Sequence, residues 1–156
     1  MPHAPDAWPS VLPQGKMGGM AFELTDQIER HLTSDQIAWL TTVTPAGRPA
    51  PRPVWFVWDG SAITIYSLNE GAKLRHLQVN DQVAVHFNSA ADGGDVVVIW
   101  GRAERVPDAP APSQFPGLLD KYAARIEQMG RTPQWYDDAY GVCLRVTPER
   151  AWTIPG

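Results

Sequence analysis

The chain has 156 residues, of which 44% are hydrophobic and 19% charged, and its formal net charge is -4 at pH 7. This length and composition predict one domain with a substantial apolar core. The net negative charge argues against binding to nucleic acid or to a membrane surface, and no apolar run approaches the roughly 20 residues that span a bilayer.

The first part of the chain, residues 1–20, is expected to be a loose arm ahead of a single domain at residues 21–156. This segment is rich in proline and glycine, which is typical of chain without regular structure. It lacks the basic segment followed by an apolar stretch that marks a secretory signal. Cys143 is the only cysteine and excludes an internal disulfide. We therefore expect a cytoplasmic protein.

The first half of the domain reads as a short helix followed by three strands. The helix begins after Thr25, a plausible N-cap. The strands are rich in β-branched and aromatic residues, and the Asp59-Gly60 turn predicts that the last two form a hairpin. These strands are expected to form an antiparallel meander. The helix and the strands fall at residues 24–32, 37–43, 54–58 and 62–68.

The second half predicts a short helix, two strands, an amphipathic helix and a final strand. The amphipathic helix carries one apolar stripe and stops at Gly130. The strands at 54–58 and 96–106 are apolar on both faces, so both faces need cover. This favours a closed antiparallel barrel of about six strands whose outside is buried by a helix or by a second subunit. The elements of this half are expected at 69–80, 82–89, 96–106, 113–130 and 140–154.

Motifs for nucleophilic and metal chemistry are lacking in the sequence. There is no Gly-x-Ser-x-Gly, His-Glu-x-x-His or Cys-x-x-Cys motif. The four histidines have no spacing typical of metal ligands, so no metal site is expected. We assign no catalytic residue. Tyr66 is a candidate proton donor, although a strand tyrosine more often packs with its hydroxyl hydrogen-bonded.

A strand, a turn and a helix at residues 63–77 carry the clearest binding signal. Lys73 and Arg75 lie in the first turn of the expected helix, where the helix dipole disfavours cations. With Ser67 just upstream, this arrangement is explained by a bound anion such as phosphate. The alternative, in which both side chains simply reach into solvent, is equally compatible with the pattern.

The position of Arg52 favours a bound anion over side chains that simply reach into solvent. It lies between Pro51 and Pro53, ahead of an apolar strand. Pairing through the Asp59-Gly60 turn is expected to set residues 52–55 opposite residues 64–67 and so to bring Arg52 to the end of the barrel that holds Ser67 and Lys73. These groups beside Trp55 and Tyr66 predict a cleft with a phosphate end and an aromatic end.

Residues 39–87, followed by 93–106, resemble the pyridoxamine 5'-phosphate oxidase-like split β-barrel flavoproteins. They are more similar still to the actinobacterial branch that binds the deazaflavin coenzyme F420. The resemblance rests on Thr-x-x-x-x-Gly-x-Pro, Pro-Val-Trp-Phe and Ala-Lys-x-Arg-x-Leu, which are specific in combination. It implies a mainly β, six-stranded antiparallel split β-barrel with peripheral helices. It also implies a homodimer with cofactors in the grooves between the barrels.

The resemblance also implies which residues bind the cofactor. Ser67, Lys73 and Arg75 are implied to bind the phosphate. The ring is implied to lie along the strand segment 52–55, beside Tyr66. Two further residues of the long fifth strand are implied to come from the partner chain. The ring residues are Arg52, Pro53, Val54 and Trp55, and those of the partner are Trp100 and Arg102.

The function implied is that of an F420H2-dependent reductase, which transfers hydride to a small unsaturated or quinone-like acceptor. Members that oxidise pyridoxamine phosphate carry additional C-terminal arginine and histidine residues, whereas this C-terminus has Arg150 and no histidine. Oxidation of vitamin B6 is therefore not expected. One alternative is an FMN-binding flavin reductase or oxidase, and the other is a non-catalytic cofactor- or haem-binding protein.

Overall fold

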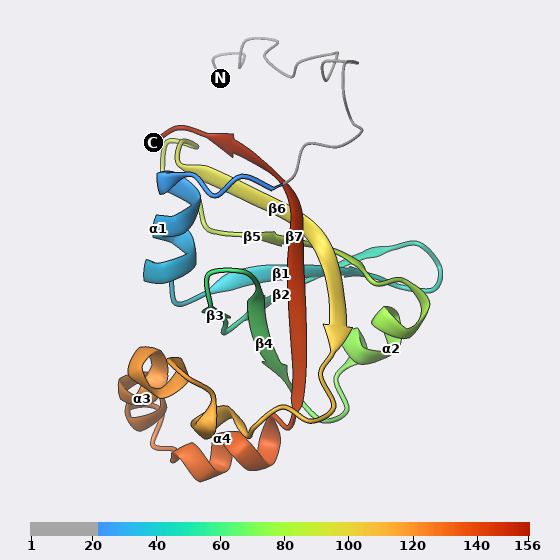
Figure 1. The fold of residues 1–156 in the computed structure, drawn as a ribbon, viewed down its shortest axis with the longest axis vertical. Coiled ribbons are helices and arrows are strands. Elements are labelled where there is room, and N and C mark those ends of the chain that lie inside the picture. Colours follow the sequence, from blue (N-terminus) through green and yellow to red (C-terminus); the bar gives the residue numbers. More distant parts are fainter. Residues whose placement is uncertain (1–21) are drawn as a thin grey trace.

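The computed structural model describes residues 22–156, so the expected N-terminal arm lies outside the described residues. Seven strands form one antiparallel sheet in the order β2-β1-β5-β6-β7-β4-β3, curled into a half-barrel (Figure 1). The expected mainly β, split-barrel fold is thus confirmed. The strands are β1 (Ala38–Val43), β2 (Pro49–Val54), β3 (Val57–Trp58), β4 (Ile63–Ser67), β5 (Gln82–His86), β6 (Val96–Arg105) and β7 (Val142–Ile154).

Helices surround the sheet without forming a second layer of their own. Figure 1 shows α1 near the C-terminus, α3 and α4 at the opposite end of the sheet, and α2 beside it. The helices are α1 (Asp26–Ser34), α2 (Ala72–Val79), α3 (Leu118–Gln128) and α4 (Pro133–Ala139), with a short 3-10 turn, η1, at Pro112–Gln114.

The structure has seven strands where six were expected, because the segment 54–58 is broken in two. The backbone of Phe56 bonds to α3 in place of a neighbouring strand. Its amide donates to the Tyr122 hydroxyl at 2.9 Å, and its carbonyl accepts from Lys121 Nζ at 3.1 Å. The chain therefore leaves β2, at one edge of the sheet, after Val54 and enters β3, at the opposite edge, at Val57.

This break makes the expected pairing of Arg52 wrong. The strand β2 pairs with β1, which sets Arg52 opposite Leu40, and the Asp59-Gly60 turn joins only β3 and β4. The prolines of β2 are tolerated because β2 is an edge strand, where a missing amide leaves no second neighbour unpaired.

The apolar core fills the inside of the curled sheet and is closed at one end by α1. Thr25 caps α1 as expected, since its hydroxyl accepts from the amide of Ile28. Ile28 and Leu32 on this helix are no more than 2% exposed. At the other end, α3 buries Leu118, Tyr122 and Ile126 in a second apolar cluster, and their spacing of four residues forms the expected apolar stripe.

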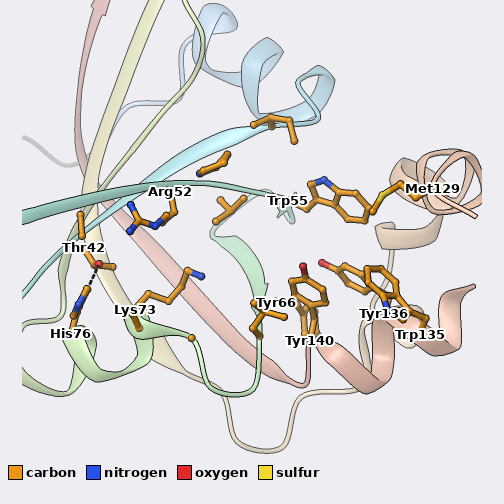
Figure 2. Close-up of a pocket in the computed structure, with 17 residues that line it drawn as sticks. Thr42, Arg52, Trp55, Tyr66, Lys73, His76, Met129, Trp135, Tyr136 and Tyr140 are labelled. Atoms are coloured by element: carbon orange, nitrogen blue, oxygen red, sulfur yellow. Dashed lines mark hydrogen bonds between the residues drawn. The ribbon is translucent and has the colours of Figure 1, made fainter. Parts of the chain in front are cut away.

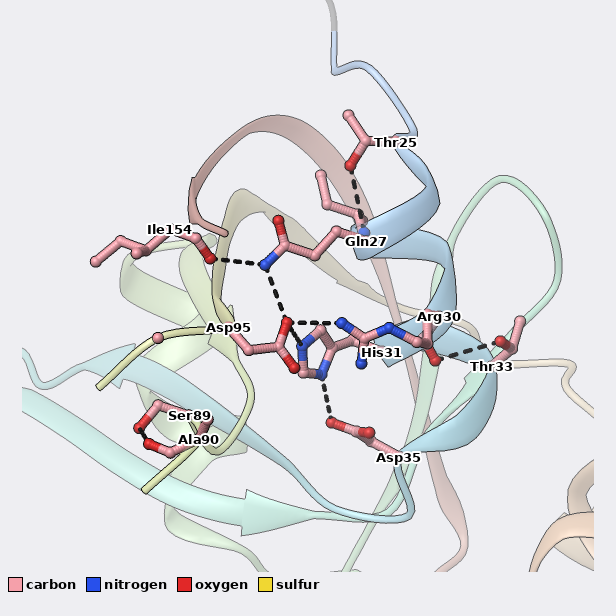
Figure 3. Close-up of polar contacts among 12 residues, drawn as sticks. Thr25, Gln27, Arg30, His31, Thr33, Asp35, Ser89, Ala90, Asp95 and Ile154 are labelled. Atoms are coloured by element: carbon pink, nitrogen blue, oxygen red, sulfur yellow. Dashed lines mark hydrogen bonds and ion pairs between the residues drawn. The ribbon is translucent and has the colours of Figure 1, made fainter. Parts of the chain in front are cut away.

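A buried histidine ties α1 to the turn between β5 and β6 (Figure 3). The ring of His31 lies between two carboxylates, 2.7 Å from Asp35 and 3.1 Å from Asp95. Asp95 also accepts hydrogen bonds from Arg30 at 2.6 Å and Gln27 at 3.0 Å. These bonds, led by the one from Arg30, hold the pKa of Asp95 well below its usual range, so this carboxylate stays charged and fixes the helix to the sheet.

Candidate functional site

A cavity of about 450 Å³ opens between β2, β4, α2 and the C-terminal helices α3 and α4 (Figure 2). Its two ends differ in chemistry. We call one the cationic end, formed by Arg52, Lys73, His76 and Thr42, and the other the aromatic end, formed by Trp55, Tyr66, Trp135, Tyr136 and Tyr140. The cavity therefore brings the predicted residues Arg52, Lys73, Trp55 and Tyr66 together within a single chain. That a phosphate binds at the cationic end stays a prediction.

Lys73 at the start of α2 is the central residue of the cationic end. Its Nζ lies 3.4 Å from the hydroxyl of Ser67, which is itself buried beneath it. Burial, and secondly the positive charge of Arg52, lower the pKa of Lys73. No acidic residue in the described range 22–156 forms an ion pair with either cation. Two neighbouring cations without an acidic partner suit an anionic ligand.

The local sequence explains why the cations stand where they do. Gly71 caps α2, and the first turn of the helix has no acidic residue to neutralise its free amides. A Cβ at Gly71 would lie 3.0 Å from the hydroxyl of Ser67 and 3.8 Å from Lys73 Nζ. Glycine at this position therefore keeps the approach to Lys73 open.

His76 is a member of the cationic end that sequence reasoning missed. It follows Lys73 by three residues and so shares a face of α2 with it. Its Nδ1 lies 2.8 Å from the hydroxyl of Thr42 on β1, which fixes the ring at the cavity wall. The helical spacing was the signal that could have identified it.

Of the other predicted site residues, some line the cavity and some do not. Pro53, Val54, Trp55 and Tyr66 line the cavity, whereas Arg75 is exposed and does not. Trp100 and Arg102 lie on β6, away from this chain's cavity. Arg102 pairs with Asp81 at 2.8 Å and with Glu149 at 3.4 Å, and Trp100 lies under the guanidinium of Arg150 at 4.8 Å. Their contribution to a partner's groove stays a prediction.

The aromatic end is built around Trp55. Its indole is stacked on the ring of Tyr122 at 4.6 Å and on that of Tyr136 at 5.2 Å. Tyr136 in turn stacks on Tyr140 at 4.6 Å. Since each stacked ring fixes the orientation of the next, this end forms a rigid aromatic wall against which a planar ligand can pack.

Tyr66 is not available as a proton donor to a ligand. Its hydroxyl donates to the carbonyl of Pro110 at 2.6 Å. Burial raises the pKa of Tyr66 above its usual range. This tyrosine therefore packs with its hydroxyl hydrogen-bonded, which was the commoner role considered for it.

The short helix α4, which brings three aromatic residues to the cavity, was not predicted. Its N-cap, Thr132, accepts from the amide of Trp135 at 3.2 Å, and Pro133 occupies the first turn. A Thr-Pro pair is a recognised helix start, so a signal was present. The helix is only seven residues long, which is too short for hydrophobic periodicity to identify it.

Among residues 22–156, including the cavity, no group of three or more His, Cys, Asp or Glu side chains is placed to hold a metal ion. A search of the same residues for a helix long and apolar enough to cross a membrane finds none.

Comparisons with known proteins agree with this fold. A family model described as "Pyridoxamine 5'-phosphate oxidase" matches residues 24–155. A search of curated protein sequences gives no match.

Several solved structures share the fold. A structure described as an F420 reductase superposes with a TM-score of 0.62 at 24% identity, covering 80% of this chain and 94% of that one. The haem storage protein HutZ from Vibrio cholerae gives 0.58 at 17% identity, covering 85% and 96%. A FAD-binding protein from Mesorhizobium loti gives 0.58 at 19% identity, covering 82% and 92%. At these identities the likeness concerns the fold alone.

Proposed function

The chain belongs to the pyridoxamine 5'-phosphate oxidase family, and from this premise we propose that it is an F420H2-dependent reductase of small unsaturated or quinone-like acceptors. The observation that carries the proposal is the cavity with cations at one end and stacked aromatic rings at the other. A cofactor with a planar ring and a phosphate-bearing tail matches both ends. The F420 reductase among the structural neighbours supports the same choice.

The residues of this chain bind and orient the cofactor in this proposal. Lys73 and Arg52 bind the phosphate, because together they supply positive charge that no acidic residue among the described ones neutralises. Val54 and Trp55 lie along the ring. When bound, reduced F420 supplies the hydride, so the protein needs no catalytic triad.

F420 is favoured over FMN because its tail extends past the phosphate and carries several carboxylates. Such a tail calls for further cations near the mouth of the cleft. Arg48 supplies such a cation in this proposal, since it lies in the exposed turn between β1 and β2, directly before the strand that carries Arg52. Guanidinium groups can bind such carboxylates through bidentate hydrogen bonds.

We expect the purified chain to bind F420 with micromolar or tighter affinity and FMN more weakly. The measurement is a titration with each cofactor, followed by absorbance and by cofactor fluorescence. Hydride transfer to a quinone is expected only with reduced F420. A protein that purifies yellow with stoichiometric FMN and ignores F420 would show that the flavin alternative is correct, and a haem absorption band would favour a haem-binding role.

We also propose that the chain functions as a homodimer through the outer face of β6 and β7. Along β6, Val97 and Ile99 are fully buried, whereas Val96, Val98 and Trp100 are only half-buried on the opposite face. This face continues onto β7, since Val98 pairs with Trp152 and Val96 with Ile154. Trp152 is 41% exposed and Ile154 37% exposed, and a row of large apolar side chains of this kind favours a partner.

The dimer is tested by light scattering of the cofactor-bound protein at micromolar concentration. We expect twice the chain mass and an interface larger than about 1,000 Å². The substitution Trp152→Glu should give a monomer, because it sets charge at the centre of the apolar row. Ala123→Glu adds the same charge to the exposed side of α3 and should stay dimeric. A monomeric wild-type protein would contradict a groove shared between chains.

A further inference from the structure

Four tyrosines surround the aromatic end, and their hydroxyl groups fall into two pairs. The hydroxyl of Tyr66 donates to the carbonyl of Pro110 at 2.6 Å, and that of Tyr122 donates to the carbonyl of Gln36 at 2.7 Å. The hydroxyls of Tyr136 and Tyr140 make no hydrogen bond to any other residue in the range 22–156. The first pair supports the fold, whereas the second is left without a structural role.

The Tyr136 hydroxyl opens into the cavity although its side chain is deeply buried. The residue is only 4% exposed. Among the described residues, every fully enclosed side-chain nitrogen or oxygen has a hydrogen-bond partner, so the unpaired hydroxyl of Tyr136 is not fully enclosed. Figure 2 shows its oxygen pointing into the space below Trp55, next to the hydroxyl of Tyr140.

The Tyr136 hydroxyl is held in this position. Its ring is stacked between Trp55, at 5.2 Å, and Tyr140, at 4.6 Å. Burial is the main cause that raises the pKa of Tyr136 above its usual range, so the phenol keeps its proton at neutral pH. A rigid, protonated and unpaired hydroxyl is a hydrogen-bond donor for a ligand oxygen.

Resting on the proposed function, we propose that Tyr136, with Tyr140 beside it, donates hydrogen bonds to the carbonyl oxygen of the acceptor. The acceptor class is thereby narrowed to conjugated carbonyl compounds, such as quinones and enones. Both hydroxyls lie at the aromatic end of the cavity, away from Lys73 in Figure 2. That position leaves them for the acceptor, because the cofactor phosphate is assigned to the cationic end.

The reaction balances with the reduced cofactor as the only reductant. A hydride from the cofactor forms a bond to the electron-poor carbon of the acceptor. The π-electron pair of the acceptor then moves onto its carbonyl oxygen, where Tyr136 stabilises the negative charge. A proton from water at the cavity mouth completes the reduced acceptor, and the oxidised cofactor returns a proton to solvent. The acceptor thus gains two electrons and two protons, one proton as part of the hydride and one from water, and the proton that the cofactor releases replaces the one taken from solvent.

The test compares two acceptors in the variant Tyr136→Phe, which keeps the ring and removes the hydroxyl. Menadione develops an oxyanion when it accepts hydride, whereas N-methylacridinium is a cation that becomes neutral and develops none. With reduced F420, kcat for menadione should fall about 100-fold, in the range for loss of one oxyanion donor. The kcat for N-methylacridinium should change less than about 3-fold.

A binding measurement gives a second readout that needs no cofactor. Lawsone is a naphthoquinone that exists as an enolate at neutral pH and so resembles the charged intermediate. Its affinity for the whole chain, followed by quenching of tryptophan fluorescence, should fall about 10-fold in Tyr136→Phe, as expected for one hydrogen bond to a charged group. Tyr122→Phe is the structural control, because it should lower thermal stability and leave the ratio of the two rates unchanged.

The outcomes separate this inference from the proposed function. Equal losses with both acceptors, together with unchanged affinity for lawsone, would mean that Tyr136 acts only in packing and would overturn the inference. If the wild-type protein reduces neither acceptor, the proposed function fails. In that case weaker binding of lawsone by Tyr136→Phe still supports an oxyanion site, and unchanged binding overturns it.

Discussion

Replacing Gly101 by alanine is expected to lower the free energy of unfolding by about 3 kcal/mol, at the upper end of the range for overpacking. Gly101 lies at a bulge between β6 and β7, where the register shifts after Trp100. A Cβ at this position would overlap the carbonyl oxygen of Thr147 and would lie 3.2 Å from the Cα of Pro148. These are backbone atoms, so no side-chain rotation can relieve the overlap.

The loss is measured as a lower urea midpoint with an unchanged slope, at one fixed protein concentration. The control is Gly47→Ala in the turn between β1 and β2. Gly47 has a φ of +80° and nothing within 4 Å of an added Cβ, so only the cost of a left-handed residue remains, about 1 kcal/mol. Unfolding of both variants at the same midpoint would mean that β6 and β7 do not approach closely at Gly101.

The second large effect is expected from Lys73→Ala. It should weaken cofactor binding by about 1.5 to 3 kcal/mol, the range for hydrogen bonds to charged groups, which corresponds to roughly 10- to 150-fold in Kd. The reason is that Lys73 lies half-buried in the cavity beside Arg52 and has no acidic partner among the residues that the structure describes. Removing one of the two cations leaves the anionic group of the cofactor with a single one.

Arg75→Ala provides a matched variant, because it removes the same charge from the same helix. Its side chain is exposed and does not line the cavity, so we expect a smaller loss of affinity than for Lys73→Ala. An equal loss would place Arg75 at the phosphate as well. Titration of each variant with F420 measures the effect, and thermal unfolding checks that both remain folded. Unchanged affinity in Lys73→Ala would exclude a phosphate at this helix start.

Local patterns were sufficient to predict that Lys73 and Ser67 lie together. Lys73 and Ser67 are six residues apart, joined by one turn, so a strand followed by a helix brings them together wherever the rest of the chain goes. The bond between them, 3.4 Å long, follows from this local geometry. His76 could have been added by the same reasoning, since it lies one helical turn after Lys73.

The part of the aromatic end that Tyr136 and Tyr140 form could not be predicted in the same way. Tyr136 and Tyr140 lie on α4 and its C-cap, far along the chain from Trp55. Nothing within the seven residues of α4 indicates that they meet Trp55. Their stacking depends on the path of β6, which leads the chain to the end of the sheet where α3 and α4 lie (Figure 1).

Arg52 shows most clearly what the sequence determined and what only the tertiary structure decided. The sequence alone determined that a proline-flanked cation precedes a buried, aromatic segment, and it indicated through family resemblance that this cation belongs to the site. The expected route was wrong, because β2 pairs with β1 and the hairpin through Asp59-Gly60 starts only at Val57. Turn and strand signals act over a few residues, whereas the choice of partner strand depends on how distant segments pack. Only the tertiary structure decided that the chain breaks at Phe56, where α3 binds its backbone, and this break leaves Arg52 beside Lys73.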